Sequence, residues 1–201
     1  MEPNQERLRN ALVCPTISQQ KSFIKNLIKM NKAVLIIGRF QPIHNGHLSL
    51  VKRYNKAGFF IKIGIGSSNR KEDIKNPLNI KEREEIITLA MKEIGIKKYR
   101  IYHIPDIKSD SHYISHVIKI VGAFDVLVTG NPWNLKLFRD YKKDNSWNIE
   151  SFEEKTRPGG EINATTIRKL WLKKPSNKGL PNSVFKQLKK INFPDRLNNL
   201  K

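Results

Sequence analysis

The chain has 201 residues, an apolar share of 38%, a single cysteine and a formal net charge of +20 at pH 7. This length is sufficient for one sizeable domain with a core of its own. Cys14 excludes a disulfide within the chain and a cysteine-based metal site, and no apolar run approaches the roughly 20 residues of a membrane span. Because the N-terminus also lacks a secretory signal, we expect a cytoplasmic protein.

The excess of lysine and arginine predicts an electropositive surface that attracts nucleotides, nucleic acid or an anionic membrane. Lysine runs such as Ile96-Lys97-Lys98 are equally typical of solvated faces. The basic residues are spread along the chain without a long basic block or interleaved aromatic residues, which is a weak signature of nucleic-acid binding. We therefore expect neither nucleic acid nor a membrane among the partners.

Residues 1–31 differ from the rest of the chain. They are polar, contain Pro3 and Pro15, and show no strand pattern. Apolar residues between Ser22 and Met30 recur at helical spacing, which predicts at most a short amphipathic helix. We interpret 1–31 as an N-terminal extension, either flexible or a short helix, and 32–201 as one domain. A chain starting at Met30 would leave that domain intact.

From Ala33 onward, apolar strands alternate with amphipathic helices. We predict strands at 33–37, 59–65, 99–104 and 124–129, a weak strand at 147–152, and helices at 46–55, 80–94, 111–121, 135–141, 164–173 and 182–191. The continuous apolar run from Ala33 to Ile37 is typical of a buried parallel strand. Helical connections between strands require right-handed crossovers, so the pattern predicts an α/β fold with a parallel sheet.

Ligands of such a sheet bind beyond the carboxyl ends of its strands, which selects the loops after Ile37, Ile65, Ile104 and Thr129. The first of these loops runs from Gly38 through Arg39 to two histidines, His44 and His47, at the start of a helix. The amino end of a helix carries unpaired N–H groups and a partial positive charge, which suits a phosphate.

If His44 lies just before the helix and His47 in its first turn, both rings reach the same anion. Gly46 between them allows that anion to approach the backbone closely. A metal site is the alternative, but two histidines without a nearby third ligand make a poor zinc site. We therefore predict a phosphate site with no metal held by the protein alone.

The segment GRFQPIHNGH at 38–47 resembles the signature of the HxGH nucleotidyltransferases, in the form found in archaeal nicotinamide-nucleotide adenylyltransferases. Four further segments are similar to motifs of that family: GIGSSNRKEDIKNPLNIKERE from Gly64, PDI at 105–107, TGNP at 129–132 and INATTIRKL at 162–170. The resemblance extends from about Ala33 to Ile191. It implies a Rossmann-like doubly wound sheet and an enzyme that joins ATP to a nucleoside monophosphate.

The resemblance also implies roles for individual residues. It makes His44, His47, Arg168 and Arg39 the catalytic group around the phosphates of ATP. The other ATP-binding positions would be Gly38, Phe40, Gly46, Gly130, Asn131, Thr165 and Thr166. Thr165 would also cap or line its helix, and its N–H and that of Thr166 would bind phosphate beside Arg168. Lys75, Asp110 and Tyr113 would contact the mononucleotide, with Tyr113 near the pyridine ring.

The implied reaction is a direct in-line attack of the 5′-phosphate of nicotinamide mononucleotide on the α-phosphorus of ATP. It yields NAD and pyrophosphate without a covalent enzyme intermediate. Such a transfer depends mainly on positioning and charge stabilisation, which suits a site of His, Arg and Lys. Mg²⁺ would bind together with ATP, since this ion needs few protein ligands. The resemblance further implies a homo-oligomer, to which no particular residue can be assigned.

Three positions depart from the family pattern. Asn163 replaces a serine, but asparagine also caps helices. Lys75 stands where an arginine is frequent, which keeps the charge and loses bidentate geometry. Asp110 replaces an asparagine near the pyridine amide. An ionised Asp110 accepts from an amide and repels a carboxylate, which favours nicotinamide over nicotinate mononucleotide. Comparing catalytic efficiency on the two substrates tests this hypothesis, and equal efficiency would refute it.

Three alternatives stay open at this point. The first is another HxGH nucleotidyltransferase with a flavin, phosphopantetheine or cytidylyl substrate. The second is a basic nucleic-acid-binding protein, which titration with DNA and RNA at two salt concentrations would identify. The third is an inactive family member, which the intact His44, His47 and Arg168 argue against.

Overall fold

A computed structural model describes residues 32–141, 147–151 and 163–200, without the side chain of Ser151. The chain divides into Met1–Asn31 and Lys32–Lys201, and only the second unit contains described residues. The predicted extension, including the short helix expected between Ser22 and Met30, therefore lies outside the described residues. None of the described helices is long and apolar enough to cross a membrane.

Five parallel strands form the sheet at the centre of this unit. They are β1 (Ala33–Gly38), β2 (Phe60–Gly66), β3 (Tyr99–Ile104), β4 (Val126–Thr129) and β5 (Asn148–Ser151), in the order β3-β2-β1-β4-β5. Val34 pairs with Ile61 of β2 and with Val126 of β4, which places β1 in the middle of the sheet. The predicted parallel sheet is confirmed, and so is the weak fifth strand, which pairs in parallel with β4.

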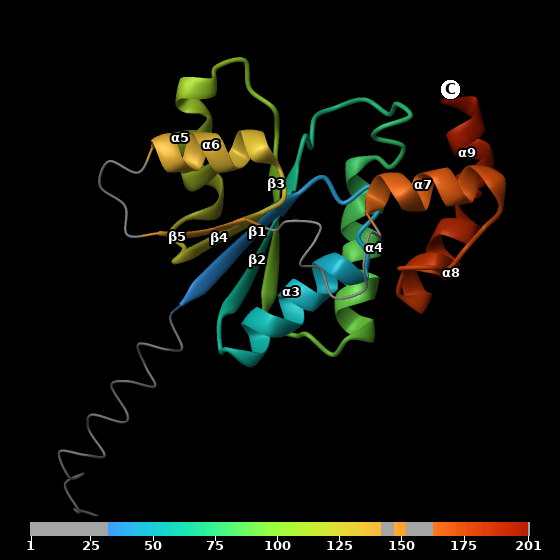
Figure 1. The fold of residues 1–201 in the computed structure, drawn as a ribbon, viewed down its shortest axis with the longest axis horizontal. Helices are drawn as coiled ribbons and strands as arrows, with labels where there is room; N and C mark the ends of the chain where they lie inside the picture. Colours follow the sequence, from blue (N-terminus) through green and yellow to red (C-terminus); the bar gives the residue numbers. More distant parts are fainter. Residues whose placement is uncertain (1–31, 142–146, 152–162, 201) are drawn as a thin grey trace, which may run out of the picture. The chain divides into compact units, whose positions relative to one another are not determined.

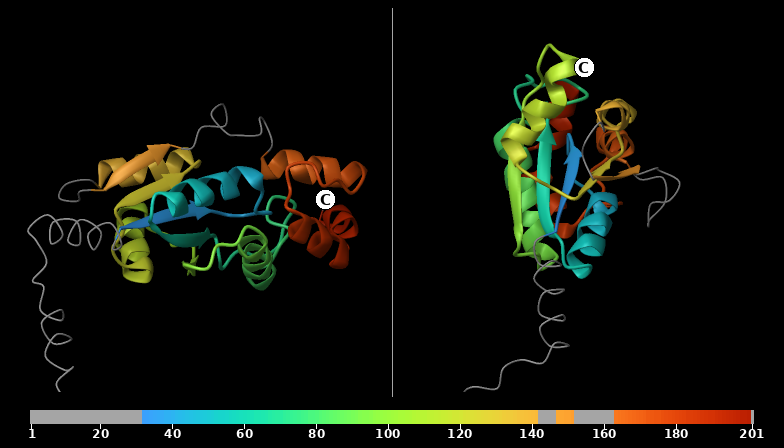
Figure 2. Two further views of the ribbon diagram at one scale, coloured as in Figure 1. Left: turned by 90° about the horizontal axis from the view of Figure 1, so that it is seen from below. Right: turned by 90° about the vertical axis from the view of Figure 1, so that its left-hand side faces the viewer.

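The helices are α3 (Asn45–Lys56), α4 (Ile80–Glu93), α5 (Asp110–Val121), α6 (Pro132–Asp140), α7 (Ala164–Lys173), α8 (Asn182–Lys190) and α9 (Phe193–Asn199). Figure 1 shows α5 and α6 on one face of the sheet and α3 and α4 on the other. Figure 2 shows α7, α8 and α9 beyond the end of the sheet toward which β1 runs. The doubly wound arrangement is therefore confirmed.

Alternating side chains of β1 supply two separate cores. Val34 and Ile36 pack with α3, α4 and the helices α7 to α9, whereas Leu35 and Ile37 pack with α5 and α6. All four side chains are buried, as the unbroken apolar run predicted. The sheet is thus fixed from both faces, and this holds the loops at its carboxyl edge in place.

Two helices differ from the prediction. The helix α6 begins at Pro132 and not at Leu135, because Asn131 caps it and proline is well suited to the first helical position. The helix α9 was not predicted at all. It has only seven residues, and its apolar side is Phe193 and Leu197, both fully buried.

Candidate active site

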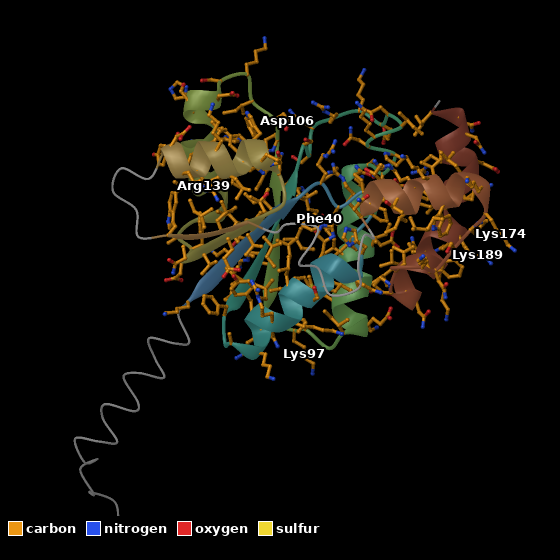
Figure 3. All side chains as sticks on the ribbon, in the orientation of Figure 1. Phe40, Lys97, Asp106, Arg139, Lys174 and Lys189 are labelled. Atoms are coloured by element: carbon orange, nitrogen blue, oxygen red, sulfur yellow. The ribbon has the colours of Figure 1, made fainter. Side chains whose placement is uncertain are left out.

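A cavity of about 450 Å³ opens at the carboxyl edge of the sheet. Its walls come from the ends of β1 and β4, the loops after β2 and β3, and the first turns of α3, α5, α6 and α7. In Figure 3, Phe40 lies just beyond the end of β1, and Asp106 lies in the loop after β3. All four loops that were selected from the sequence contribute to this cavity.

His44 and His47 lie at the amino end of α3, as predicted. His44 is the residue that precedes the helix, with extended backbone, and its carbonyl accepts from the N–H of His47 and of Leu48. The two ring centroids are 3.9 Å apart, and His44 is only 2% exposed. Both rings line the cavity. The buried helix end therefore presents two imidazoles to the same small volume.

Phe40 fixes the bend by which the chain leaves β1. Its φ of 49° lies in the left-handed region, which is unfavourable for a bulky residue and is typical of functional sites. Its buried ring contacts His47 edge-on, with centroids 4.9 Å apart. A Cβ at Gly38 would lie 3.2 Å from the Phe40 ring, so glycine gives this ring its space.

Arg168 and Arg39 bring two guanidinium groups to the cavity. Arg168 is 8% exposed and begins the second turn of α7. It donates to the Gln41 carbonyl at 2.8 Å and to Thr165 Oγ1 at 3.2 Å. Burial lowers the pKa of Arg168, and the charge of Arg39 lowers it further. Two mutually repelling cations at a cavity wall favour an anionic ligand, which would stabilise both charges.

The loop that contains Lys75 is linked to the site by a hydrogen bond between Asn76 and Arg39. Arg39 Nη1 donates to Asn76 Oδ1 at 3.2 Å, and Asn76 Nδ2 donates to both carboxylate oxygens of Asp73 at 3.0 Å. Partial burial raises the pKa of Asp73, but the hydrogen bonds from Asn76 and Lys75 outweigh it and leave the pKa below its usual value. Lys75 itself is exposed and does not line the cavity.

Two buried polar residues hold the loops around the cavity together. Gln41 exchanges two hydrogen bonds of 2.9 Å with the backbone of Leu78. Arg83, 2% exposed, donates to the carbonyls of Arg39 (3.2 Å), Gly66 (2.8 Å) and Ser67 (3.1 Å). Burial, helped by Arg39, lowers the pKa of Arg83 to about 10. Arg83 lies in the segment from Gly64 that resembles a family motif, but the sequence analysis did not predict that it positions these loops.

The amino end of α7 is capped by Asn163, whose Oδ1 accepts from the N–H of Thr166 at 2.8 Å. The expectation that asparagine preserves the cap is confirmed. The cap also corrects the expected role of Thr166: its N–H is already engaged, and its side chain does not line the cavity. Thr165, which does not provide the cap, lines the cavity.

Aromatic side chains form another wall, between α5 and α6. Tyr113 and Trp133 lie with ring centroids 4.7 Å apart, and both line the cavity beside Gly130 and Asn131. Burial and the charge of Asp106 raise the pKa of Tyr113 to about 12, so its hydroxyl stays protonated. Trp133 was not predicted as a site residue, although its position directly after the TGNP segment is a signal that could have identified it.

Asp110 does not line the cavity. Its carboxylate accepts from the indole N–H of Trp133 at 3.3 Å. The structure therefore places Trp133, and not Asp110, at the surface that a ligand would meet.

The structure brings most of the predicted residues together. The cavity is lined by His44, His47, Arg168, Arg39, Gly38, Phe40, Gly130, Asn131, Thr165 and Tyr113. Four predicted residues do not line it: Gly46, which is buried in the first turn of α3, and Thr166, Lys75 and Asp110.

Asp106 is the one carboxylate among the described residues that line the cavity. Its Oδ1 accepts from Ser67 Oγ at 3.0 Å, and its Oδ2 pairs with Arg70 at 3.4 Å. Within 32–141, 147–151 and 163–200, no group of three or more His, Cys, Asp or Glu residues is placed to hold a metal ion. One carboxylate is sufficient for an ion such as Mg²⁺, because phosphate and water supply most of its ligands.

The chain is similar to several known proteins. Residues 35–170 match the family model described as cytidylyltransferase-like. Over 173 residues, the chain is 32% identical to the nicotinamide-nucleotide adenylyltransferase of Thermococcus onnurineus, covering 84% of this chain and 88% of the relative. It is 31% identical to the enzyme of the same name from Thermoplasma acidophilum, covering 86% and 93%.

Among solved structures, a bifunctional NMN adenylyltransferase/ADP-ribose pyrophosphatase from Francisella tularensis matches with a TM-score of 0.67 and 21% identity. The match covers 85% of this chain and 52% of that protein, so the chain spans about half the length of the bifunctional enzyme. At this identity the likeness shows a shared fold.

The family match and the relatives show that the chain is a nucleotidyltransferase. The chain belongs to the cytidylyltransferase-like family, in the branch formed by these nicotinamide-nucleotide adenylyltransferases.

Proposed function

We propose that the protein transfers the adenylyl group of ATP to nicotinamide mononucleotide, forming NAD and pyrophosphate. The relatives named above carry this activity in their names. The observation that carries the proposal is the grouping of two imidazoles and two guanidinium groups at one helix end, beside an aromatic wall. Cations suit a triphosphate, and a ring pair suits a base.

In this proposal the 5′-phosphate of the mononucleotide attacks the α-phosphorus of ATP in line, and pyrophosphate leaves. His47 and His44 stabilise the charge that develops on the α-phosphate, while Arg168 and Arg39 hold the leaving β- and γ-phosphates. Arg168 is already fixed by its bonds to Gln41 and Thr165, so little reorganisation accompanies binding. No covalent intermediate is required, because positioning and charge stabilisation provide the catalysis.

Mg²⁺ would enter the site with ATP and neutralise part of the phosphate charge. Asp106 is the residue that would supply a protein ligand, directly or through water. Adenine would lie against Gly130 and Asn131, and the pyridine ring would lie near Tyr113. Lys75, exposed in its loop, would meet the mononucleotide phosphate only if that loop moves inward.

The experiment is incubation of the full chain with ATP, Mg²⁺ and a panel of mononucleotides, with pyrophosphate and the dinucleotide product measured. We expect NAD from nicotinamide mononucleotide. Product from a flavin, phosphopantetheine or cytidylyl substrate instead would replace the proposal with another member of the family. We further propose that the enzyme acts as a homo-oligomer in the cytoplasm, which light scattering and cell fractionation test.

A further inference from the structure

Asn76 is a buried amide in the loop between β2 and α4, and its neighbours fix which way the amide faces. The residue is 4% exposed, and its Nδ2 donates to both carboxylate oxygens of Asp73 at 3.0 Å. An ionised carboxylate accepts hydrogen bonds and donates none, so the amide nitrogen must face Asp73. The amide oxygen is thereby left for Arg39, whose Nη1 donates to it at 3.2 Å.

The turn around Asn76 is braced in two ways. Asp73 and Asn76 each donate a backbone N–H to the carbonyl of the other, at 3.3 and 2.9 Å, and Asp73 Oδ1 also accepts from the N–H of Asn76 at 2.7 Å. Two residues further on, Leu78 exchanges two hydrogen bonds of 2.9 Å with Gln41 of the loop after β1. The turn is therefore fixed both within itself and against the segment that carries Arg39.

The side chain of Arg39 lies in surroundings that favour its displacement. Arg39 is exposed and lines the cavity, and a long exposed side chain loses rotamer freedom when it binds a ligand. Burial lowers the pKa of Arg168 and of Arg83, and the charge of Arg39 lowers both further. The same repulsion acts on Arg39 and drives its guanidinium toward solvent. The hydrogen bond to Asn76 opposes both effects.

We propose that Asn76 is a positioning residue, which holds the guanidinium of Arg39 where it meets the β- and γ-phosphates of ATP. The proposal rests on the proposed function, which assigns these phosphates to Arg39. Asp73 contributes one step further away, by orienting the amide of Asn76. Neither Asn76 nor Asp73 lines the cavity, so both act through Arg39. Their effect on affinity is therefore confined to ligands that carry a polyphosphate.

Binding measurements on the full chain test this inference without depending on turnover. Calorimetry at constant free Mg²⁺ gives dissociation constants for ATP, for pyrophosphate and for AMP, which lacks the β- and γ-phosphates. The wild type is compared with Asn76→Ala and with Asp73→Ala, which removes a less buried side chain of the same turn. Arg39→Leu, alone and combined with Asn76→Ala, shows whether the effect passes through the guanidinium.

Asn79→Ala is the matched control. Asn79 belongs to the same loop, and its side chain caps α4 by accepting from the N–H of Glu82 at 3.0 Å. Loss of this cap destabilises the end of the loop but removes no hydrogen bond to Arg39. We therefore expect Asn79→Ala to bind all three ligands as the wild type does. Thermal unfolding verifies that each variant folds.

We expect Asn76→Ala to bind ATP and pyrophosphate about three- to tenfold more weakly, as the loss of one hydrogen bond allows, and to bind AMP unchanged. Asp73→Ala should weaken the same two ligands by a smaller factor. In the Arg39→Leu background, Asn76→Ala should have no further effect. An equal loss of AMP affinity, a full effect without Arg39, or unchanged ATP affinity would overturn the inference. A wild type that shows the expected pattern but forms no NAD would refute the proposed function alone.

Discussion

Single residues at the amino end of α3 carry the chemistry proposed for this site. The His44 and His47 rings face one another at 3.9 Å, and the buried end of the helix adds its partial positive charge. Arg39 and Arg168 lie beside them, and the pKa of Arg168 is lowered first by burial and further by repulsion from Arg39. The free protein therefore stores electrostatic repulsion that a bound polyphosphate would relieve.

Replacing His47 by alanine tests this arrangement. We expect His47→Ala to lower kcat roughly 10²- to 10³-fold, as the loss of one donor to developing charge does in other enzymes. His103→Ala is the matched control, since His103 is an exposed residue of β3 paired with Glu84. Steady-state assays with ATP and nicotinamide mononucleotide measure both. A loss below about fivefold for His47→Ala would show that its ring does not contact the reacting phosphate.

The sequence predicted those site residues that follow a strand directly. His44 and His47 stand in a fixed relation to β1 and α3, so local pattern was sufficient to place them. It was not sufficient for Arg83. Arg83 bonds to carbonyls 16 to 44 residues away in the chain. Such contacts depend on tertiary structure, which no residue spacing encodes.

At the level of elements, β2 contains two glycines with different packing. A Cβ at Gly64 would lie 2.6 Å from Ile104 Cδ1, whereas the nearest atom at Gly66 would be the Gly38 carbonyl oxygen at 3.8 Å. We expect Gly64→Ala to lower the free energy of unfolding by about 1–3 kcal/mol through overpacking. Gly66→Ala should change it by less than about 0.5 kcal/mol.

Urea denaturation of the two glycine variants measures this difference. Adding Ile104→Val to Gly64→Ala removes the methyl group that collides, so the double variant should recover part of the lost stability. Equal destabilisation by the two glycine substitutions would contradict the packing explanation.

The junction between α4 and α8 depends on a carboxylate that caps a neighbouring helix. Glu93, the last residue of α4, accepts from the N–H of Asn182 at 3.1 Å and of Ser183 at 2.7 Å, and so caps α8. Partial burial raises the pKa of Glu93, but these hydrogen bonds outweigh it and hold the pKa below its usual value. The cap therefore stabilises the fold at neutral pH and is lost as pH falls through the folded-state pKa.

Substitution of Glu93 tests the cap. At pH 7 we expect Glu93→Ala to lower the free energy of unfolding by about 1 kcal/mol. Glu85→Ala, at an exposed position of the same helix, is the control for the change in helix propensity. The difference between the two variants should shrink at about pH 3, where the free carboxyl group is protonated. A difference of the same size at both pH values would argue against a charged cap.

Element boundaries show where local pattern stops being informative. The strands and the longer helices were predicted to within one or two residues in most cases, because burial on both faces of the sheet leaves unbroken apolar runs. The helix α9 has too few residues to display a period, and its two buried side chains gain their meaning only from contact with the preceding helices. The early start of α6 follows from the Asn131 cap and from Pro132 in the first turn, which have no helical apolar period.

The whole molecule carries a net charge of +20 that its site alone does not explain. The basic side chains labelled in Figure 3 are Lys97 after α4, Arg139 on α6, Lys174 at the end of α7 and Lys189 on α8. They come from separate elements. A field of this kind attracts anions toward the protein in general, and the cavity then selects among them.

Long-range attraction of this kind weakens with salt, because the Debye length falls to about 10 Å at 0.1 M. ATP bears more negative charge than nicotinamide mononucleotide, whose pyridinium offsets part of its phosphate charge. We therefore expect kcat/KM for ATP to fall severalfold between about 0.02 and 0.2 M KCl, and kcat/KM for the mononucleotide to fall less. Initial rates with each substrate varied in turn, at constant free Mg²⁺, measure both slopes. Equal slopes would mean that contacts inside the cavity, and not the surface charge, govern the capture of ATP.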